Sequence, residues 1–158
     1  MGSVVGSVAS MPADGVRLTH HLTAVLTAIW FEIDHGDGSG VSAHFTPDAT
    51  LTVLAHTVCG RPQIDELYAS RAARGPRVSR HLVTNVHLSA ATDTMAETVS
   101  SLCLFAEDGD APRPITTPAM VADVVDRFEH RAGRWFISSR HIRAVFMASG
   151  TVLGVATQ

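Results

Sequence analysis

Four long candidate β-strands follow one another in the second half of this 158-residue chain. Short segments of turn-forming residues separate them, as they separate the strands of hairpins. The expected strands cover residues 78–89, 95–106, 119–131 and 134–147, with turn-forming residues at 91–93, 108–110 and 132–133. Chain reversals of this kind join antiparallel neighbours, so the pattern predicts a sheet made of long hairpins.

The first half of the chain is predicted to be mainly helical. Apolar residues recur at helical spacing from Leu18 to Asp34, and the three glycines within 36–40 end that helix. The other elements expected here are a short helix over 41–45, a turn over 46–48, a strand over 49–55 and a helix that opens at Arg61 or Pro62 and ends near Ala73. Helices followed by long antiparallel strands give an α+β order. Residues 16–147 form the expected domain, between a flexible N-terminus (1–15) and a C-terminal tail (148–158).

Composition excludes several classes of protein. Hydrophobic residues make up 46% of the chain and charged residues 17%, which is too apolar for a disordered chain. The formal net charge of -3 gives no cationic field, so neither nucleic acid nor an anionic membrane surface is expected as a partner. No apolar run approaches the ~20 residues of a membrane span. All 12 basic residues are arginines, which excludes a lysine Schiff base.

Cysteine and histidine spacing predicts neither disulfides nor a metal site. Cys59 and Cys103 are too few for a disulfide scaffold, and we interpret them as small apolar side chains. None of the nine histidines has the spacing of a metal-ligand set. Segment 1–15 lacks a positive n-region and a long apolar core, so the cytoplasm is the expected compartment.

Asp34 and the strand that begins near His81 are the candidate functional features. Asp34 lies at the C-terminal end of the first helix, where the helix dipole disfavours a carboxylate. It is therefore either solvated in a turn or pointed into a cavity, where it would orient an imidazole. Alternation places His81, Val83, Asn85 and His87 on one face of their strand. If that face lines a cavity, His81 and Asn85 are polar groups in an apolar pocket, which is the usual makeup of a small-molecule site.

Two other features are interpreted as structural. Asp126 and Arg140 lie on adjacent expected strands, where opposite charges pair across the sheet. Trp135 is expected in the core, and the acidic residues Asp108 and Asp110 belong to a turn.

Several of these features form an ordered set of motifs between residues 18 and 147. They are Ile-Asp at 33–34, Phe-Thr-Pro-Asp-Ala at 45–49, Gly-Arg-Pro-Gln-Ile at 60–64, Arg-His-Leu-Val-Thr-Asn at 80–85, Asp-Arg-Phe at 126–128, Gly-Arg-Trp at 133–135 and Arg140. The set resembles the SnoaL-like branch of the nuclear-transport-factor-2-like superfamily, near scytalone dehydratase and bile-acid dehydratase. The resemblance implies a cone of curved antiparallel sheet, closed by three N-terminal helices around a deep pocket.

The same resemblance implies an Asp–His dyad, in which Asp34 matches the family's aspartate and His81 its catalytic histidine. In those dehydratases the dyad abstracts a proton next to a carbonyl, and water leaves from the β-carbon without a metal or organic cofactor. The chain departs from them at the tyrosines that bind the substrate carbonyl, because Val53 stands at one such position and Tyr68 is its single tyrosine. The expected pocket is lined by Trp30, Val53, Tyr68, Val83, Asn85 and Cys103.

Three functions stay open at this point. The first is a cofactor-independent lyase or isomerase, in which the dyad acts on an apolar, polycyclic or polyketide-like molecule by dehydration, isomerisation or cyclisation. The second is a non-catalytic binding or assembly module of the same fold. The third is an epoxide hydrolase, which needs a second inward carboxylate beside Asp34. The apolar outer face of Leu82, Thr84, Val86 and Leu88 also predicts a homo-oligomer, a trimer by resemblance or otherwise a dimer, unless the tail covers that face.

Overall fold

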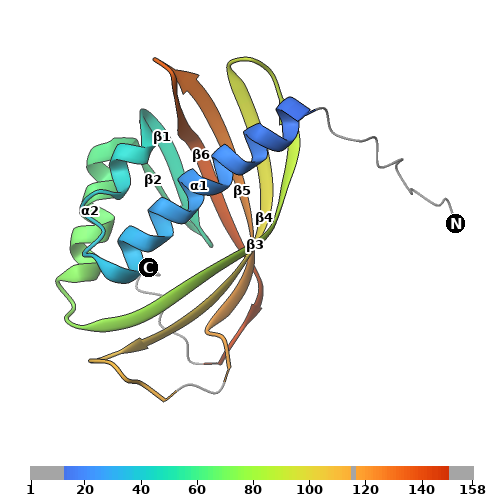
Figure 1. Cartoon of the computed structure of the whole chain (residues 1–158). Coiled ribbons are helices and arrows are strands. Elements are labelled where there is room, and N and C mark those ends of the chain that lie inside the picture. Colours follow the sequence, from blue (N-terminus) through green and yellow to red (C-terminus); the bar gives the residue numbers. More distant parts are fainter. Residues whose placement is uncertain (1–12, 115–116, 150–158) are drawn as a thin grey trace, which may run out of the picture.

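A curved six-stranded sheet wraps around one long helix in the computed structural model of the protein (Figure 1). The structure describes residues 13–114 and 117–149, so most of the expected N-terminal segment and C-terminal tail lies outside it. The helices are α1 (Ala13–His35) and α2 (Gly60–Ala72), with a short 3-10 helix, η1 (Val41–His44), between them. The strands are β1 (Phe45–Val53), β2 (His56–Cys59), β3 (Arg77–Ala91), β4 (Met95–Asp108), β5 (Met120–Arg131) and β6 (Arg134–Met147).

The α+β class is confirmed, whereas the expected purely antiparallel sheet is wrong at one pairing. The strand order is β2-β1-β6-β5-β4-β3, and β1 pairs with β6 in parallel. The chain crosses from β2 through α2 to the far edge of the sheet and returns by three antiparallel steps, so β6 arrives beside β1 in the same direction. The sheet is curved but not closed, and in the described part of the chain the three expected helices are α1, the short 3-10 helix η1 and α2 (Figure 1).

Two local expectations in the first half are corrected. Residues 46–48, predicted as a turn, are extended and belong to β1. Pairing with β2 begins only after them, at Thr50. Pro47 is tolerated because the register of β1 is irregular between Phe45 and Thr50. Strand β2 was not predicted, since four residues are too few to show an alternation.

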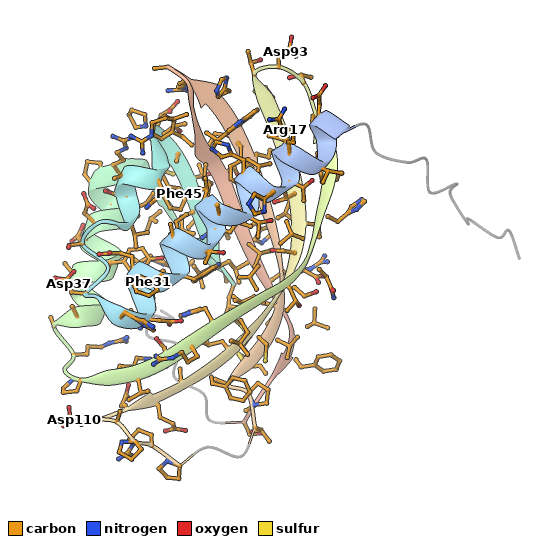
Figure 2. The ribbon with its side chains drawn as sticks, in the orientation of Figure 1. Arg17, Phe31, Asp37, Phe45, Asp93 and Asp110 are labelled. Atoms are coloured by element: carbon orange, nitrogen blue, oxygen red, sulfur yellow. The ribbon has the colours of Figure 1, made fainter. Side chains whose placement is uncertain are left out.

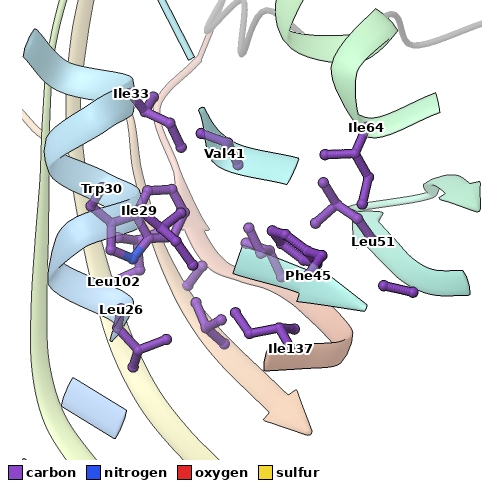
Figure 3. Packing of buried hydrophobic residues seen from close by; sticks show 14 of the residues in the cluster. Leu26, Ile29, Trp30, Ile33, Val41, Phe45, Leu51, Ile64, Leu102 and Ile137 are labelled. Atoms are coloured by element: carbon purple, nitrogen blue, oxygen red, sulfur yellow. The ribbon is translucent and has the colours of Figure 1, made fainter. Parts of the chain in front are cut away.

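The core lies between α1 and the concave face of the sheet. Strand β4 buries every second residue from Ala96 to Leu104, as alternation along a half-buried strand requires. Helix α1 contributes apolar side chains of one face, and Figure 3 shows Leu26, Trp30 and Ile33 projecting from the helix into the cluster. Charged turn residues such as Asp93 and Asp110 point outward at opposite ends of the β3–β4 hairpin (Figure 2). Within the described ranges, no helix is long and apolar enough to cross a membrane.

One ion pair is buried in this apolar core. Arg140 donates from Nε and Nη2 to the two carboxylate oxygens of Asp126, at 2.7 and 3.2 Å, and both side chains are at most 1% exposed. The two residues are direct cross-strand partners on β5 and β6, as expected. The guanidinium of Arg140 also lies 5.0 Å from the ring of Trp30 and 5.7 Å from that of Phe45. The pair therefore lies inside the apolar core, and its guanidinium packs against Trp30, which borders the candidate site.

Candidate active site

Asp34 points from the end of α1 to the start of β3, where it holds His81 by two contacts. Its Oδ1 lies 2.6 Å from Nδ1 of His81, and its Oδ2 accepts the backbone N–H of His81 at 2.7 Å. The hydroxyl of Ser79 donates to Oδ1 at 2.7 Å. The side chains of Asp34 and His81 are only 7% and 10% exposed. Asp34 is therefore a held, inward-pointing carboxylate and not a solvated one.

These contacts determine the charge on Asp34. Burial disfavours the carboxylate, but the hydrogen bonds from His81 and Ser79 and the electrostatic interaction with His81 outweigh it, so the pKa of Asp34 lies below its ordinary value. An ionised carboxylate only accepts hydrogen bonds, and this assigns the ring proton of a neutral His81 to Nδ1. The other ring nitrogen, Nε2, is left basic and has no hydrogen-bond partner among the described residues.

Trp30 fixes the plane of the imidazole. Its ring stacks on that of His81 with the centroids 4.4 Å apart and the planes 15° from parallel. Trp30 and Asp34 are four residues apart on α1, so one face of the helix presents both of them to His81. The histidine is thus held at its edge by a carboxylate and on its face by an aromatic ring. Such restraint from two sides positions a functional group before any ligand binds.

His81 lines a cavity between α1, α2 and the concave face of the sheet. Helix α1 contributes Trp30 and Ile33, α2 contributes Leu67, Tyr68 and Arg71, and the strands contribute Val53, His81, Leu102, Leu104, Met120 and Ile142. The empty space has a volume of about 560 Å³, including solvent at its mouth. The wall is mainly apolar, with the few polar groups that a small-molecule site uses for orientation.

Three of the six expected pocket residues line this cavity, namely Trp30, Val53 and Tyr68. Asn85 does not, because a β-bulge interrupts β3 between Thr84 and His87. Asn85 adopts a left-handed conformation with φ of 53°, which asparagine tolerates better than most residues. The extra residue reverses the alternation, so Asn85 is exposed and Val86 packs against the core instead.

The other two expected residues also lie outside the cavity wall. Val83 is partly buried and packs against the core cluster. Cys103 faces the opposite side of β4, because its neighbours Leu102 and Leu104 take the inward positions. The structure therefore does not bring Val83, Asn85 and Cys103 to the wall of this cavity.

Arg71 and Ser79 belong to the site and were missed. Arg71 follows Leu67 by four residues and Tyr68 by three on α2, and this spacing from two apolar residues is the one sequence signal for its place on the same face. Arg71 donates from Nη2 to the hydroxyl oxygen of Ser79 at 3.1 Å. Ser79 in turn donates to Asp34, so a hydrogen-bonded chain connects Arg71 to the dyad.

Tyr68 brings a phenol into the cavity. Its ring packs on Gly38, where a Cβ would lie only 3.0 Å from the ring, and the φ of +81° at Gly38 also favours glycine. Burial raises the pKa of Tyr68, against the charges of Arg140 and Arg71, so the hydroxyl keeps its proton at neutral pH. The part of the chain that is described offers this hydroxyl no hydrogen-bond partner.

Comparisons with known proteins agree with this architecture. The model of the SnoaL-like domain matches residues 16–141, and the chain belongs to this family. A search of the curated proteins found no match. Across the described ranges, no three His, Cys, Asp or Glu side chains gather as a metal site would need.

Solved structures of the same fold share little sequence with this chain. A variant of Rv3472 from Mycobacterium tuberculosis, a protein of unknown function, is 20% identical over 90% of this chain and 81% of its own, with a TM-score of 0.72. A candidate scytalone dehydratase from Novosphingobium aromaticivorans is 14% identical over 89% and 93%, with a TM-score of 0.75. ActVI-ORFA from Streptomyces coelicolor is 19% identical over 84% and 98%, with a TM-score of 0.72. At these identities the likeness establishes the fold alone.

Proposed function

We propose that this protein is a cofactor-independent lyase or isomerase that acts on an apolar, polycyclic or polyketide-like carbonyl compound. The observation that carries the proposal is the 2.6 Å contact between Asp34 and Nδ1 of His81, which leaves Nε2 as the free basic nitrogen of a cavity-lining imidazole. A neutral imidazole is a suitable general base near neutral pH. Dehydration, double-bond isomerisation and ring closure all begin with the removal of a proton next to a carbonyl, and all three fit the family.

The proposed chemistry follows from the restraint of His81. Nε2 takes a proton from the carbon next to the substrate carbonyl, and the C–H electron pair moves into an enolate. Asp34 stabilises the imidazolium that forms, as a carboxylate does for histidine in other acid–base pairs. In a dehydration the imidazolium then gives its proton to the β-hydroxyl, which leaves as water while the double bond forms. In an isomerisation it returns the proton to another carbon of the same enolate.

Tyr68 is the proposed partner of the carbonyl oxygen. The dehydratases that the chain resembles use tyrosines for this role, but Val53 stands at one of those positions, and Ile29 and Ile33 stand near the others. Tyr68 offers a protonated phenol from α2 on the wall of the same cavity. A buried donor aimed at a developing enolate oxygen stabilises the charge where it appears.

The alternatives are less well supported by the residues of the wall. An epoxide hydrolase needs a second carboxylate on the cavity, and among the described residues the ionisable groups that line it are Tyr68, Arg71 and His81. Asp126 does not serve, since Arg140 occupies both of its oxygens. A non-catalytic binding module would use the same cavity, and the experiment below separates it from an enzyme.

Dehydration of a synthetic β-hydroxy ketone tests the proposal. 4-Hydroxy-4-(2-naphthyl)butan-2-one gives a conjugated enone whose absorbance reports turnover directly. We expect the protein to accelerate this reaction and His81→Gln to lower the rate about 10²- to 10⁴-fold. His87→Gln, an exposed histidine on the same strand, is the matched control and should keep full activity. Equal rates for the protein and His81→Gln would favour the binding module.

A further inference from the structure

Arg71 is a cation on the wall of a mainly apolar cavity. Its side chain extends from the same face of α2 as Leu67 and Tyr68, and all three line the space beside His81. Burial, followed by the charge of Arg77, lowers the pKa of Arg71, although a guanidinium remains protonated in proteins. A charge placed there loses part of its hydration. In proteins, a partner of opposite charge normally compensates for this lost solvation.

The described residues provide little of that compensation. A guanidinium has five N–H donors, and Arg71 uses one of its nitrogens, Nη2, in a hydrogen bond to the neutral hydroxyl of Ser79. Within the described ranges, it forms no ion pair. The nearest link to a carboxylate passes through Ser79 to Asp34, and Asp34 is already engaged by the ring and backbone of His81.

We propose that Arg71 binds an anionic oxygen of the ligand, so that the cavity takes an apolar ring compound that carries a carboxylate. The apolar rings of the ligand would pack against Trp30, Leu102 and Met120, while its carboxylate accepts hydrogen bonds from the free N–H groups of Arg71. Arginine suits this task because its planar fork matches the two oxygens of a carboxylate. This inference rests on the proposed function for the choice of cavity, but it concerns binding and not turnover.

A purely structural role for Arg71 is the competing explanation. In that case the guanidinium would only orient the hydroxyl of Ser79, and its loss would weaken every ligand of the cavity alike. An anion-binding role instead predicts a loss that depends on the charge of the ligand. Two ligands of the same ring system, one charged and one neutral, therefore separate the two roles.

Isothermal titration calorimetry with 2-naphthoate and methyl 2-naphthoate provides this comparison. We expect the intact protein to bind 2-naphthoate about 10- to 100-fold more tightly than the ester, as a hydrogen bond to a charged group implies. Arg71→Gln should remove most of this preference by weakening 2-naphthoate alone, and Arg71→Lys should restore part of it. Arg74→Gln, an exposed arginine just beyond α2, is the matched control and should leave both affinities unchanged.

Several results would overturn the inference. They are the absence of measurable 2-naphthoate binding, equal affinities for the two ligands, or an Arg71→Gln variant that loses both ligands to the same extent while its circular dichroism spectrum remains that of the folded protein. His81→Gln distinguishes this failure from failure of the proposed function. If His81→Gln keeps the preference for 2-naphthoate but the intact protein shows no turnover, the anion site stands and the catalytic proposal fails.

Discussion

Asp34 holds His81 through two different oxygens, one on the ring at 2.6 Å and one on the backbone N–H at 2.7 Å. The backbone contact ties the end of α1 to the start of β3, and the ring contact fixes the orientation of the imidazole. One carboxylate therefore contributes to both the fold and the proposed chemistry, and its substitution has consequences in both.

Asp34→Asn should lower the rate of the proposed reaction about 10²- to 10⁴-fold, because an amide favours the wrong tautomer and leaves the imidazolium uncompensated. Steady-state kinetics with the naphthyl β-hydroxy ketone measure the effect. The double variant with His81→Gln should be no slower than His81→Gln alone, since the two residues act as a unit. The control is Asp37→Asn, because Asp37 is an exposed aspartate three residues after Asp34 in the sequence. Fully additive losses would contradict the coupling.

The stability of the protein should depend on the ionisation of Asp34 in acid. Because its pKa is lower in the folded protein than in the unfolded chain, folding favours the ionised form. The resulting stabilisation is present above the unfolded pKa, near 3.8, and is lost as the pH falls through the folded pKa. Urea unfolding between pH 2.5 and 6 should therefore show a smaller acid loss in Asp34→Asn than in the intact protein. Equal losses would show that the contacts of Asp34 do not favour its charged form.

Tyr68→Phe should separate activity from stability. The described residues offer its hydroxyl no hydrogen bond, so its removal should leave the free energy of unfolding nearly unchanged. The same change should slow turnover on the order of 10²-fold if the phenol stabilises the enolate oxygen. Urea unfolding and steady-state kinetics of one variant test both parts. A variant with full activity would remove Tyr68 from the mechanism.

The buried ion pair should matter far more for stability than an exposed one on the same strand. Arg140→Met leaves the carboxylate of Asp126 buried without a partner, which costs about 3–5 kcal/mol. Arg143→Met removes a pair with Asp123 whose arginine is 72% exposed, and it should have little effect. Urea unfolding compares the two variants. Equal destabilisation would show that burial of the Asp126–Arg140 pair does not determine its contribution.

An apolar row on the outer sheet surface is the expected site of self-association. In the sheet register Leu82 faces Cys103, Cys103 faces Val121 and Val121 faces Phe146, and the two end residues are 49% and 69% exposed. This row replaces the expected face of β3, because the bulge at Asn85 turns the residues beyond it toward the core. Light scattering should show a dimer or trimer that Leu82→Glu and Phe146→Glu dissociate, while Val16→Glu on α1 does not. A monomer at micromolar concentration would contradict the prediction.

The sequence predicted those parts of the structure that depend on regular patterns. Helical spacing defined the apolar face of α1, turn residues bounded the four long strands, and alternation grouped His81 with Val83 on one face of β3. Alternation fails where one residue breaks the period, and a single left-handed residue, Asn85, was enough to misplace the second half of β3. A four-residue strand and a parallel pairing across the sheet leave no local signal, so β2 and the β1–β6 pair could not be predicted.

In the candidate site, too, residues on regularly patterned elements were predicted, and a residue placed by long-range packing was missed. The contact of Asp34 with His81 followed from the resemblance and from two patterned elements, α1 and β3. Arg71 was missed because its role depends on which face of α2 meets the sheet, and that is set by packing between distant segments. Its spacing from Leu67 was visible in the sequence, but a short helix with few apolar residues does not define an inner face by itself.

Hydrogen–deuterium exchange at the carbon next to a carbonyl tests the central claim most directly, because this proton transfer is common to dehydration, isomerisation and cyclisation. The compound 4-(2-naphthyl)butan-2-one has no β-hydroxyl, so exchange in D₂O is its only expected reaction, and proton NMR follows it. The account predicts exchange that is accelerated by the intact protein and by His87→Gln, and lowered at least about 10²-fold in His81→Gln. Exchange at the same rate with the intact protein and His81→Gln would contradict a role for His81 as the general base.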